Sequence, residues 1–220
     1  MTTTFNSRLA KNEIVIFMRN QDIFTITQRG VTTDNDTGTF SADTEYVINK
    51  TNVKNIRAIT VDATPLVFGT DYLVDYNFLD TTIKCKITFT SAQTGAYDIE
   101  YDYGTDKIYP DLPRTDLSID SFPRIAIDTI GLDTEELGLG ADANMTNASF
   151  AIYVYDSKTS TIESFIDTLR TKFIQNKKNF FYMNFLTVVT VGPMLLYGSG
   201  KQKIYQKNLD LISLFNVEEV

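Results

Sequence analysis

The strongest constraint in this sequence is the strict alternation of apolar and polar residues in the stretch GAYDIEYDYG, residues 95–104. Every second side chain of a strand points to the same face of its sheet. The apolar side chains of this stretch therefore share one face: Tyr97, Ile99, Tyr101 and Tyr103. The carboxylates share the other face: Asp98, Glu100 and Asp102. We predict a strand with one buried face and one solvated, acidic face.

Shorter segments of the same kind precede this strand. Residues 55–61, 71–78 and 82–89 alternate in the same way, and turn-forming residues separate them. The polar cluster DNDTG at residues 34–38 is typical of a hairpin turn. Several short strands separated by turns at this spacing predict a small all-β sandwich domain over residues 31–104.

A proline-containing segment follows this domain. The sequence TDKIYPDLPRTD carries Pro110 and Pro113, which cannot donate a backbone hydrogen bond and which favour extended chain. It marks the best domain boundary in the sequence. We therefore predict that residues 1–30 form the N-terminal helix of a core fold, that residues 31–104 are an inserted β-domain, and that residues 105–220 complete the core.

The core is predicted to be an α+β fold, with helices packed on an antiparallel sheet. One helix is expected to end near Asn20. A second begins at Ser160, where Ser160 and Glu163 have the spacing of a capping box and a single apolar stripe follows. The predicted strands of the core flank this helix: 123–130, 149–157, 180–191 and 203–215. The residues between the first two, 131–147, are predicted to form a polar loop.

Composition argues against several kinds of chemistry. The chain has no His and a single Cys, so zinc sites built from His and Cys, intrachain disulfides and catalytic His pairs are all excluded. Cys85 lies in an alternating strand pattern and is expected to be a buried thiol. We expect no enzymatic activity, no metal and no cofactor. The N-terminus has no signal-peptide pattern, and the longest apolar stretch is short and contains Gly192 and Pro193, so no membrane span is expected.

Charge is distributed unevenly along the chain. The net charge is −8, and the acidic excess lies in residues 30–160, which argues against non-specific binding to nucleic acid. The last third instead carries a group of lysines: Lys177, Lys178, Lys201, Lys203 and Lys207. These lysines are explained by solubility and protection of sheet edges, or by contact with an acidic surface on a neighbouring copy of the chain.

The order of elements in the core resembles a known family. A leading helix, the strand FPRIAID, the segment Glu136-Leu137-Gly138, the strand FAIYVYD and the helix that opens at Ser160 resemble the tail terminator, or tail completion, proteins of tailed bacteriophages. The resemblance covers residues 5–30 and 105–220. It rests on the order of elements and not on an invariant motif, and the family has no catalytic residues to carry over.

The resemblance implies a structural protein of the virion, assembled in the host cytoplasm and located in the tail or neck. Copies of the chain would form a ring, expected to be a hexamer, at the head-proximal end of the tail. The ring would end polymerisation of the tail tube and contact the tube protein on one side and a neck, connector or head-completion protein on the other. DNA would pass through its lumen without sequence-specific binding.

The carboxylates of the predicted loop fit such a lumen. If residues 131–147 line the DNA path, their negative charge would repel the phosphates and let DNA slide: Asp133, Glu135, Glu136 and Asp142. Two alternatives stay open. The chain could be another neck, head-closure or tail-tube protein, or a carbohydrate-binding β-module of a virion protein. Exposed aromatic side chains on residues 31–104 would favour the last of these.

Overall fold

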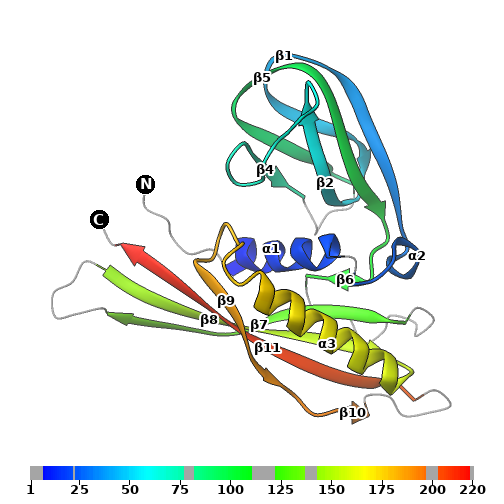
Figure 1. Ribbon diagram of the computed structural model, residues 1–220, viewed down its shortest axis with the longest axis vertical. Coiled ribbons are helices and arrows are strands. Elements are labelled where there is room, and N and C mark those ends of the chain that lie inside the picture. Colours follow the sequence, from blue (N-terminus) through cyan, green and yellow to red (C-terminus); the bar gives the residue numbers. More distant parts are fainter. Residues whose placement is uncertain are drawn as a thin grey trace. The chain divides into compact units, whose positions relative to one another are not determined.

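The chain forms two compact units. The computed structural model describes residues 7–21, 23–76, 82–110, 122–136, 143–196 and 203–218. Unit 1 comprises residues 1–23 and 107–220, and unit 2 comprises residues 24–106. Colours in Figure 1 follow the chain from one unit into the other and back. The predicted insertion lies inside unit 2, which additionally takes in residues 24–30 and 105–106.

The prediction of an α+β fold with packed helices is wrong. Strands account for 58% of the described chain and helices for 20%, so the protein is a β-rich molecule with two sheets. Its helices are α1 (Ser7–Asn20), the single-turn α2 (Ile26–Arg29) and α3 (Thr159–Gln175). The strand content is high because residues predicted to be turns or loops, such as 34–38 and 131–136, continue neighbouring strands.

Unit 1 contains a six-stranded sheet. Its strand order is β10 (Leu195–Leu196), β11 (Tyr205–Glu218), β8 (Ala143–Asp156), β7 (Arg124–Glu136) and β6 (Ile108–Tyr109), and β9 (Phe185–Val191) also pairs with β11. Only the short β6 runs parallel to its neighbour; every other pair of described strands in this sheet is antiparallel.

One face of this sheet carries the core of unit 1. Directly paired residues on β7, β8, β11 and β9 are fully or almost fully buried on that face: Ile127, Phe150, Ile152, Leu209, Leu211 and Leu186. The buried stripe of α3 packs against it, and Phe17 of α1 contacts Phe173 of α3 with ring centroids 5.0 Å apart. We call this the helix face and the opposite side the open face.

Unit 2 has a single five-stranded sheet, not the predicted two-sheet sandwich. The order is β1 (Val31–Thr51), β5 (Lys84–Gly104), β2 (Val53–Val61) and β3 (Thr64–Pro65), and β4 (Tyr72–Asp75) pairs with β5. β1 and β5 are long and irregular, with register shifts between residues 41 and 45, where Ala42 has a φ of 62°. Such bulges bend a strand, so one curved sheet encloses the core of unit 2 (Figure 1).

Candidate assembly surface of unit 1

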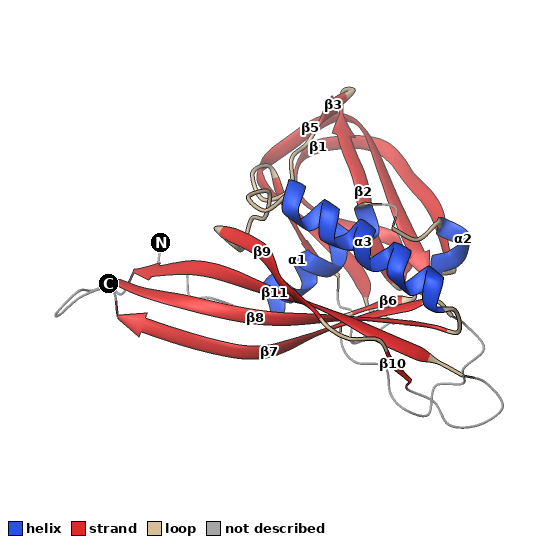
Figure 2. Ribbon diagram, turned by 60° about the horizontal axis from the view of Figure 1, so that its bottom comes forward, coloured by secondary structure: helices blue, strands red, loops and turns tan. Residues whose placement is uncertain are grey.

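The strands β7, β8 and β11 extend side by side beyond the helices (Figure 2). Pairing between β7 and β8 continues to Glu136 opposite Asn144, and pairing between β8 and β11 continues to Ala143 opposite Glu218. The predicted polar loop 131–147 is therefore wrong over most of its length. Its polar residues occur in two segments that hydrogen-bond to each other, and their alternation was too weak to reveal a strand pair.

The carboxylates predicted to line a DNA path lie in and near this extension. Asp133 is exposed on β7, directly opposite Asn147 of β8. Glu135 and Glu136 belong to the last residues of β7. Asp142 lies outside the described residues. Asp133, Glu135 and Glu136 thus belong to one strand, which is paired with β8 and is not a loop.

One edge of the unit 1 sheet is formed by β7. The short β6 covers this edge only opposite Ile125 and Ala126, and no described strand pairs with it from Ile127 onward. A register shift lies between Thr129 and Gly131. Two aliphatic side chains at this edge, Ile130 and Leu132, are 53% and 51% exposed. A free edge of this kind offers backbone groups for pairing with another strand.

The opposite edge is formed by β9. β9 pairs with β11 on one side, and no described strand pairs with its other side. At its start the backbone N–H of Leu186 donates to the carbonyl of Lys177 at 2.9 Å, so the free edge runs from Thr187 to Val191. Val189 is 60% exposed and Val191 is also exposed. Among the described strands, the sheet therefore ends on each side in an edge that has no partner strand and carries exposed aliphatic side chains.

The predicted basic group is divided between two ends of the sheet. Lys177 and Lys178 are exposed in the turn after α3, and the ammonium of Lys177 lies 5.7 Å from the ring centroid of Phe185. Lys203 is exposed just before β11. The first residue of β11, Tyr205, lies about 30 Å along the strand from Leu214, the residue opposite Phe185. Lys201 lies outside the described residues.

The fifth lysine of that group has a partner inside its own chain. Lys207 Nζ lies 2.6 Å from Glu163 Oε2. The predicted capping box is also wrong, because the N-cap of α3 is Lys158, two residues before the predicted N-cap Ser160, and it makes no side-chain capping hydrogen bond. A capping box does exist in the chain, between Thr25 and Gln28 of α2, where it was not predicted.

A buried carboxylate fixes the segment between α3 and β9. Glu13 of α1 accepts backbone hydrogen bonds from Phe181 and from Tyr182, the latter at 2.9 Å. Burial raises the pKa of Glu13 to about 7, although the two backbone hydrogen bonds lower it. Phe180, next in this segment, packs on Phe17 with ring centroids 5.1 Å apart. These contacts hold in place the segment that leads into the β9 edge.

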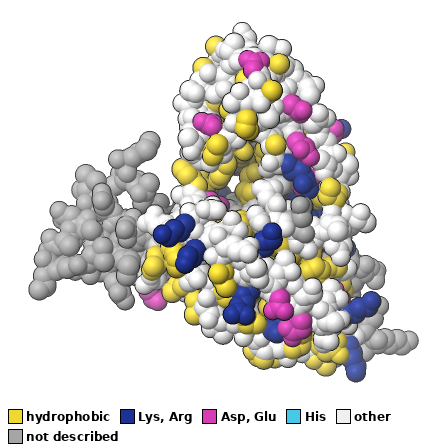
Figure 3. Space-filling view, in the orientation of Figure 1, with side chains coloured by type: hydrophobic (Ala, Val, Ile, Leu, Met, Phe, Trp, Pro, Cys, Tyr) yellow, Lys and Arg dark blue, Asp and Glu magenta, His cyan; other side chains and the backbone are white. Residues whose placement is uncertain are grey.

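Side chains of both signs are spread over the surface of unit 1, with exposed apolar groups between them (Figure 3). On the open face, Tyr153 lies near Asp128 of β7 and Asp210 of β11. Its pKa is raised first by burial and then by the negative charge of these two carboxylates. In the described part of the chain, no group of three or more acidic or Cys residues is arranged to hold a metal ion.

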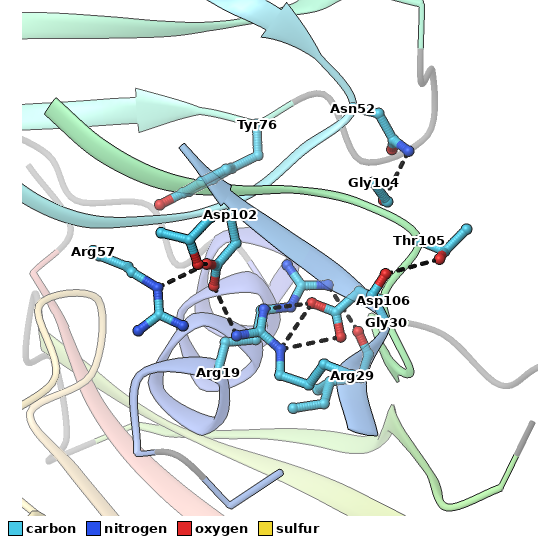
Figure 4. A network of polar contacts seen from close by, with 12 residues as sticks. Arg19, Arg29, Gly30, Asn52, Arg57, Tyr76, Asp102, Gly104, Thr105 and Asp106 are labelled. Atoms are coloured by element: carbon cyan, nitrogen blue, oxygen red, sulfur yellow. Dashed lines mark hydrogen bonds and ion pairs between the residues drawn. The ribbon is translucent and has the colours of Figure 1, made fainter. Parts of the chain in front are cut away.

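Unit 2 contains a buried network of charged residues (Figure 4). Arg29 lies 2.8 Å from Asp102 and 2.5 Å from Asp106, and Arg57 lies 2.7 Å from Asp102, with both carboxylates fully buried. The prediction that Asp102 belongs to a solvated strand face is therefore wrong, although Asp98 and Glu100 are exposed. Strand alternation cannot show that two arginines distant in sequence converge on one carboxylate.

Burial alone would raise the pKa of Asp102. The hydrogen bond from Arg57, the charge of Arg29 and the hydrogen bond from Thr33 outweigh burial and hold this pKa below its usual range. The carboxylate is thus ionised in the folded protein. The network joins the beginning and the end of unit 2, because Arg29 precedes β1 while Asp102 and Asp106 lie at the end of β5 and just after it.

The aromatic side chains of unit 2 pack inward. Tyr101 and Tyr46 donate hydroxyl hydrogen bonds to the buried carboxylate of Asp36, at 3.0 and 3.1 Å. The ring of Phe40 stacks on Tyr97 with centroids 4.1 Å apart. Every Phe and Tyr in the described part of unit 2 is buried or half-buried. Cys85 is fully buried as predicted, and burial raises the pKa of its thiol.

No protein-family model matches the chain, and no curated protein is significantly similar to it in sequence. Among the described helices, none is both long and apolar enough to cross a membrane.

Proposed function

We propose that this chain is a structural protein that assembles into a closed ring of identical copies, and that the ring belongs to the tail or neck of a tailed bacteriophage as a tail terminator. The observation that carries the assembly role is the pair of free, apolar edges at opposite sides of the unit 1 sheet. Two different edges on one subunit favour head-to-tail contacts, which close into rings or continue as filaments.

The phage assignment is supported by the order of elements. Helix α1, strands β7 and β8, helix α3 and strands β9 and β11 follow one another as in the resemblance drawn from the sequence, with unit 2 inserted after α1. The proposed ring has six copies, ends the tail tube and meets a neck or connector protein. The proposal involves no catalysis, no cofactor and no specific contact with DNA bases.

Two earlier ideas are not part of this proposal. The acidic residues were predicted to face the lumen from a loop. Residues 131–136 instead form a paired strand, so their position in the lumen stays a prediction. The carbohydrate-binding module required exposed aromatic side chains on the inserted domain. In the described part of unit 2 these side chains pack against one another and against Asp36, which accounts for them without a ligand.

The proposal is tested by measuring the mass of the purified chain by light scattering and imaging the same sample by negative stain. The expected result is closed six-fold rings, alone or on added tail tubes. A Val189→Lys variant should prevent assembly because it places a charge on the β9 edge. Val67→Lys is the matched control, since Val67 is 58% exposed in unit 2 and lies on neither edge.

Other outcomes would decide against the proposal. Long tubes of the chain itself would assign it as a tail-tube protein. A chain that stays monomeric both alone and with purified tail tubes would contradict the assembly role altogether.

A further inference from the structure

The two free edges of unit 1 are complementary in direction. β7 is antiparallel to β8, β8 to β11 and β11 to β9, so β7 and β9 run in opposite directions at the two sides of the sheet. If a second copy continues the same sheet, its β9 lies beside β7 of the first copy and runs antiparallel to it. Antiparallel pairing allows well-aligned hydrogen bonds between the two edges.

The register within one subunit sets which residues would meet. Asp133, Asn147, Leu214 and Phe185 occupy one row across the four strands. Asp128, Ala151, Asp210 and Thr190 occupy another row. In a ring whose strands run along the axis, rotation keeps every row at the same height. Asp128 of one copy then meets Thr190 of the next, and Asp133 lies in the row of Phe185, beside the Lys177 turn that ends the free β9 edge.

Charges at the ends of the two edges match in this arrangement. Asp133 is exposed at the end of the β7 edge, whereas Lys177 and Lys178 are exposed at the start of the β9 edge. Asp133 lies on the open face, and so does Phe185, because it pairs with Leu214. The Lys177 ammonium above the Phe185 ring is therefore on the same face as the incoming carboxylate. Opposite charges brought together in this way fix the register of two partners.

The same charges disfavour pairing of identical edges. Two antiparallel β7 edges would bring the carboxylates of Asp128 and Asp133 together with those of the other copy, whereas two antiparallel β9 edges would leave the lysines at opposite ends of the contact without acidic partners. The aliphatic side chains are exposed on both edges, so either edge can bury them against the other: Ile130, Leu132, Val189 and Val191. Pairing of a β7 edge with a β9 edge removes these aliphatic side chains from water and also brings opposite charges together.

From these observations we infer that copies of the chain join by antiparallel pairing of the β7 edge, Ile127–Asp133, with the β9 edge, Thr187–Val191, of the next copy. Asp133 of one copy contacts Lys177 and Lys178 of the next. The inference rests on the proposed ring and specifies its subunit contact.

A cysteine pair tests the register. Asp128→Cys combined with Thr190→Cys should give disulfide-linked oligomers up to the full ring on oxidation, because opposed antiparallel residues are within disulfide reach. The same two positions cannot bridge within one chain, since three strand spacings, about 14 Å, separate them. Cys85 is buried and does not compete. Asp128→Cys with Thr187→Cys, two rows out of register because of the register shift between Val188 and Thr190, is the matched control and should give no ladder.

A charge exchange tests the contact itself. Asp133→Lys should raise the concentration needed for assembly about tenfold, and Lys177→Asp with Lys178→Asp should do the same. The three changes together should restore assembly. If rings form normally in all the charge variants and the Asp128–Thr190 disulfide does not form, the assigned edges are wrong. The proposed ring would still stand. Failure of the unmodified chain to form rings would instead overturn the proposed function.

Discussion

The two units of this protein differ in where the charged residues discussed above lie. In unit 2, the carboxylates of Asp36, Asp102 and Asp106 are buried and bonded to side chains of the same unit. In unit 1, Asp133 and Lys177 are exposed at the two free edges of the sheet. The unit 2 sheet also has an edge strand, β1, for which β5 is the only described partner. The difference between the units therefore lies in the charges, because unlike charges at two edges of one sheet favour head-to-tail association.

Because of this difference, we expect mutations that affect stability and mutations that affect assembly to lie in different units. Changes in the buried network of unit 2 should lower the free energy of unfolding and leave subunit contacts unchanged. Changes at the edges of unit 1 should do the reverse. The expected effects below run from the largest to the smallest.

Removing the central arginine of unit 2 should have the largest effect on stability. Arg29→Met takes the guanidinium away from two buried carboxylates, and breaking a buried pair in this way costs about 3–5 kcal/mol. The measurement is the free energy of unfolding by urea, with fluorescence or circular dichroism as the probe. Lys50→Met, which removes an exposed pair with Asp34, is the control and should change little. Equal effects of the two changes would mean that the network does not hold unit 2 together.

The buried carboxylate of unit 1 should make stability depend on pH. The pKa of Glu13 is raised from 4.5 to about 7, so between these values the unfolded chain has lost the proton that the folded chain keeps. Stability therefore falls as pH rises from 4.5 to 7, by about 3 kcal/mol, and is constant above. Urea unfolding across this range should show the fall, and Glu13→Gln should abolish it. Glu163→Gln, at an exposed carboxylate, should leave the fall in place.

Unit 2 should respond to pH with the opposite sign. The pKa of Asp102 is lowered from 3.8, so its contribution is fully present above pH 3.8 and is lost as pH falls through the folded value. A pH profile of unfolding that showed no loss of stability in acid would contradict the ionised network.

Loss of the capping box of α2 should have a moderate effect. Thr25→Ala removes the hydroxyl that accepts the Gln28 N–H at 3.1 Å, which costs about 1 kcal/mol. Thr27→Ala, at an exposed position inside the same helical turn, is the control. The free energy of unfolding distinguishes the two, and a larger loss from Thr27→Ala would contradict a role for the cap.

The smallest effect is expected for the surface ion pair of unit 1. Lys207→Ala removes the contact with Glu163, whose side chain is half exposed, and should lower stability by about 0.5 kcal/mol. Its assembly should be unchanged, because Lys207 is bonded within its own chain. If Lys207→Ala instead prevented ring formation, the division between internal and interfacial lysines would be incorrect.

Much of the local structure could be predicted from the sequence. The helices ending at Asn20 and covering residues 160–175 have apolar stripes, and the strands at 55–61, 95–104 and 124–130 have clear periodicity. These signals are strong because burial on one side imposes a period on many consecutive residues.

The errors occurred where local signals depend on distant partners. Residues 34–38 and 131–136 look like turns, but β5 and β8 supply hydrogen-bonding partners that make them strands. Glu163 has capping-box spacing, yet Lys207 binds it. The free edges could not be predicted at all, because an edge is defined by the absence of a neighbouring strand and not by its own residues.

The contact between Arg29 and Asp106 also affects how the chain can accommodate a second unit. These residues are separated by 77 positions, and closing a flexible loop of that length costs about 4 kcal/mol of chain entropy. When unit 2 folds, its own contacts fix its two ends together. The entropy cost of closing this loop is therefore part of the folding of unit 2. To the rest of the chain, the whole insertion then behaves like a short connection, and an exchange of unit 2 for another folded domain with adjacent termini should be tolerated.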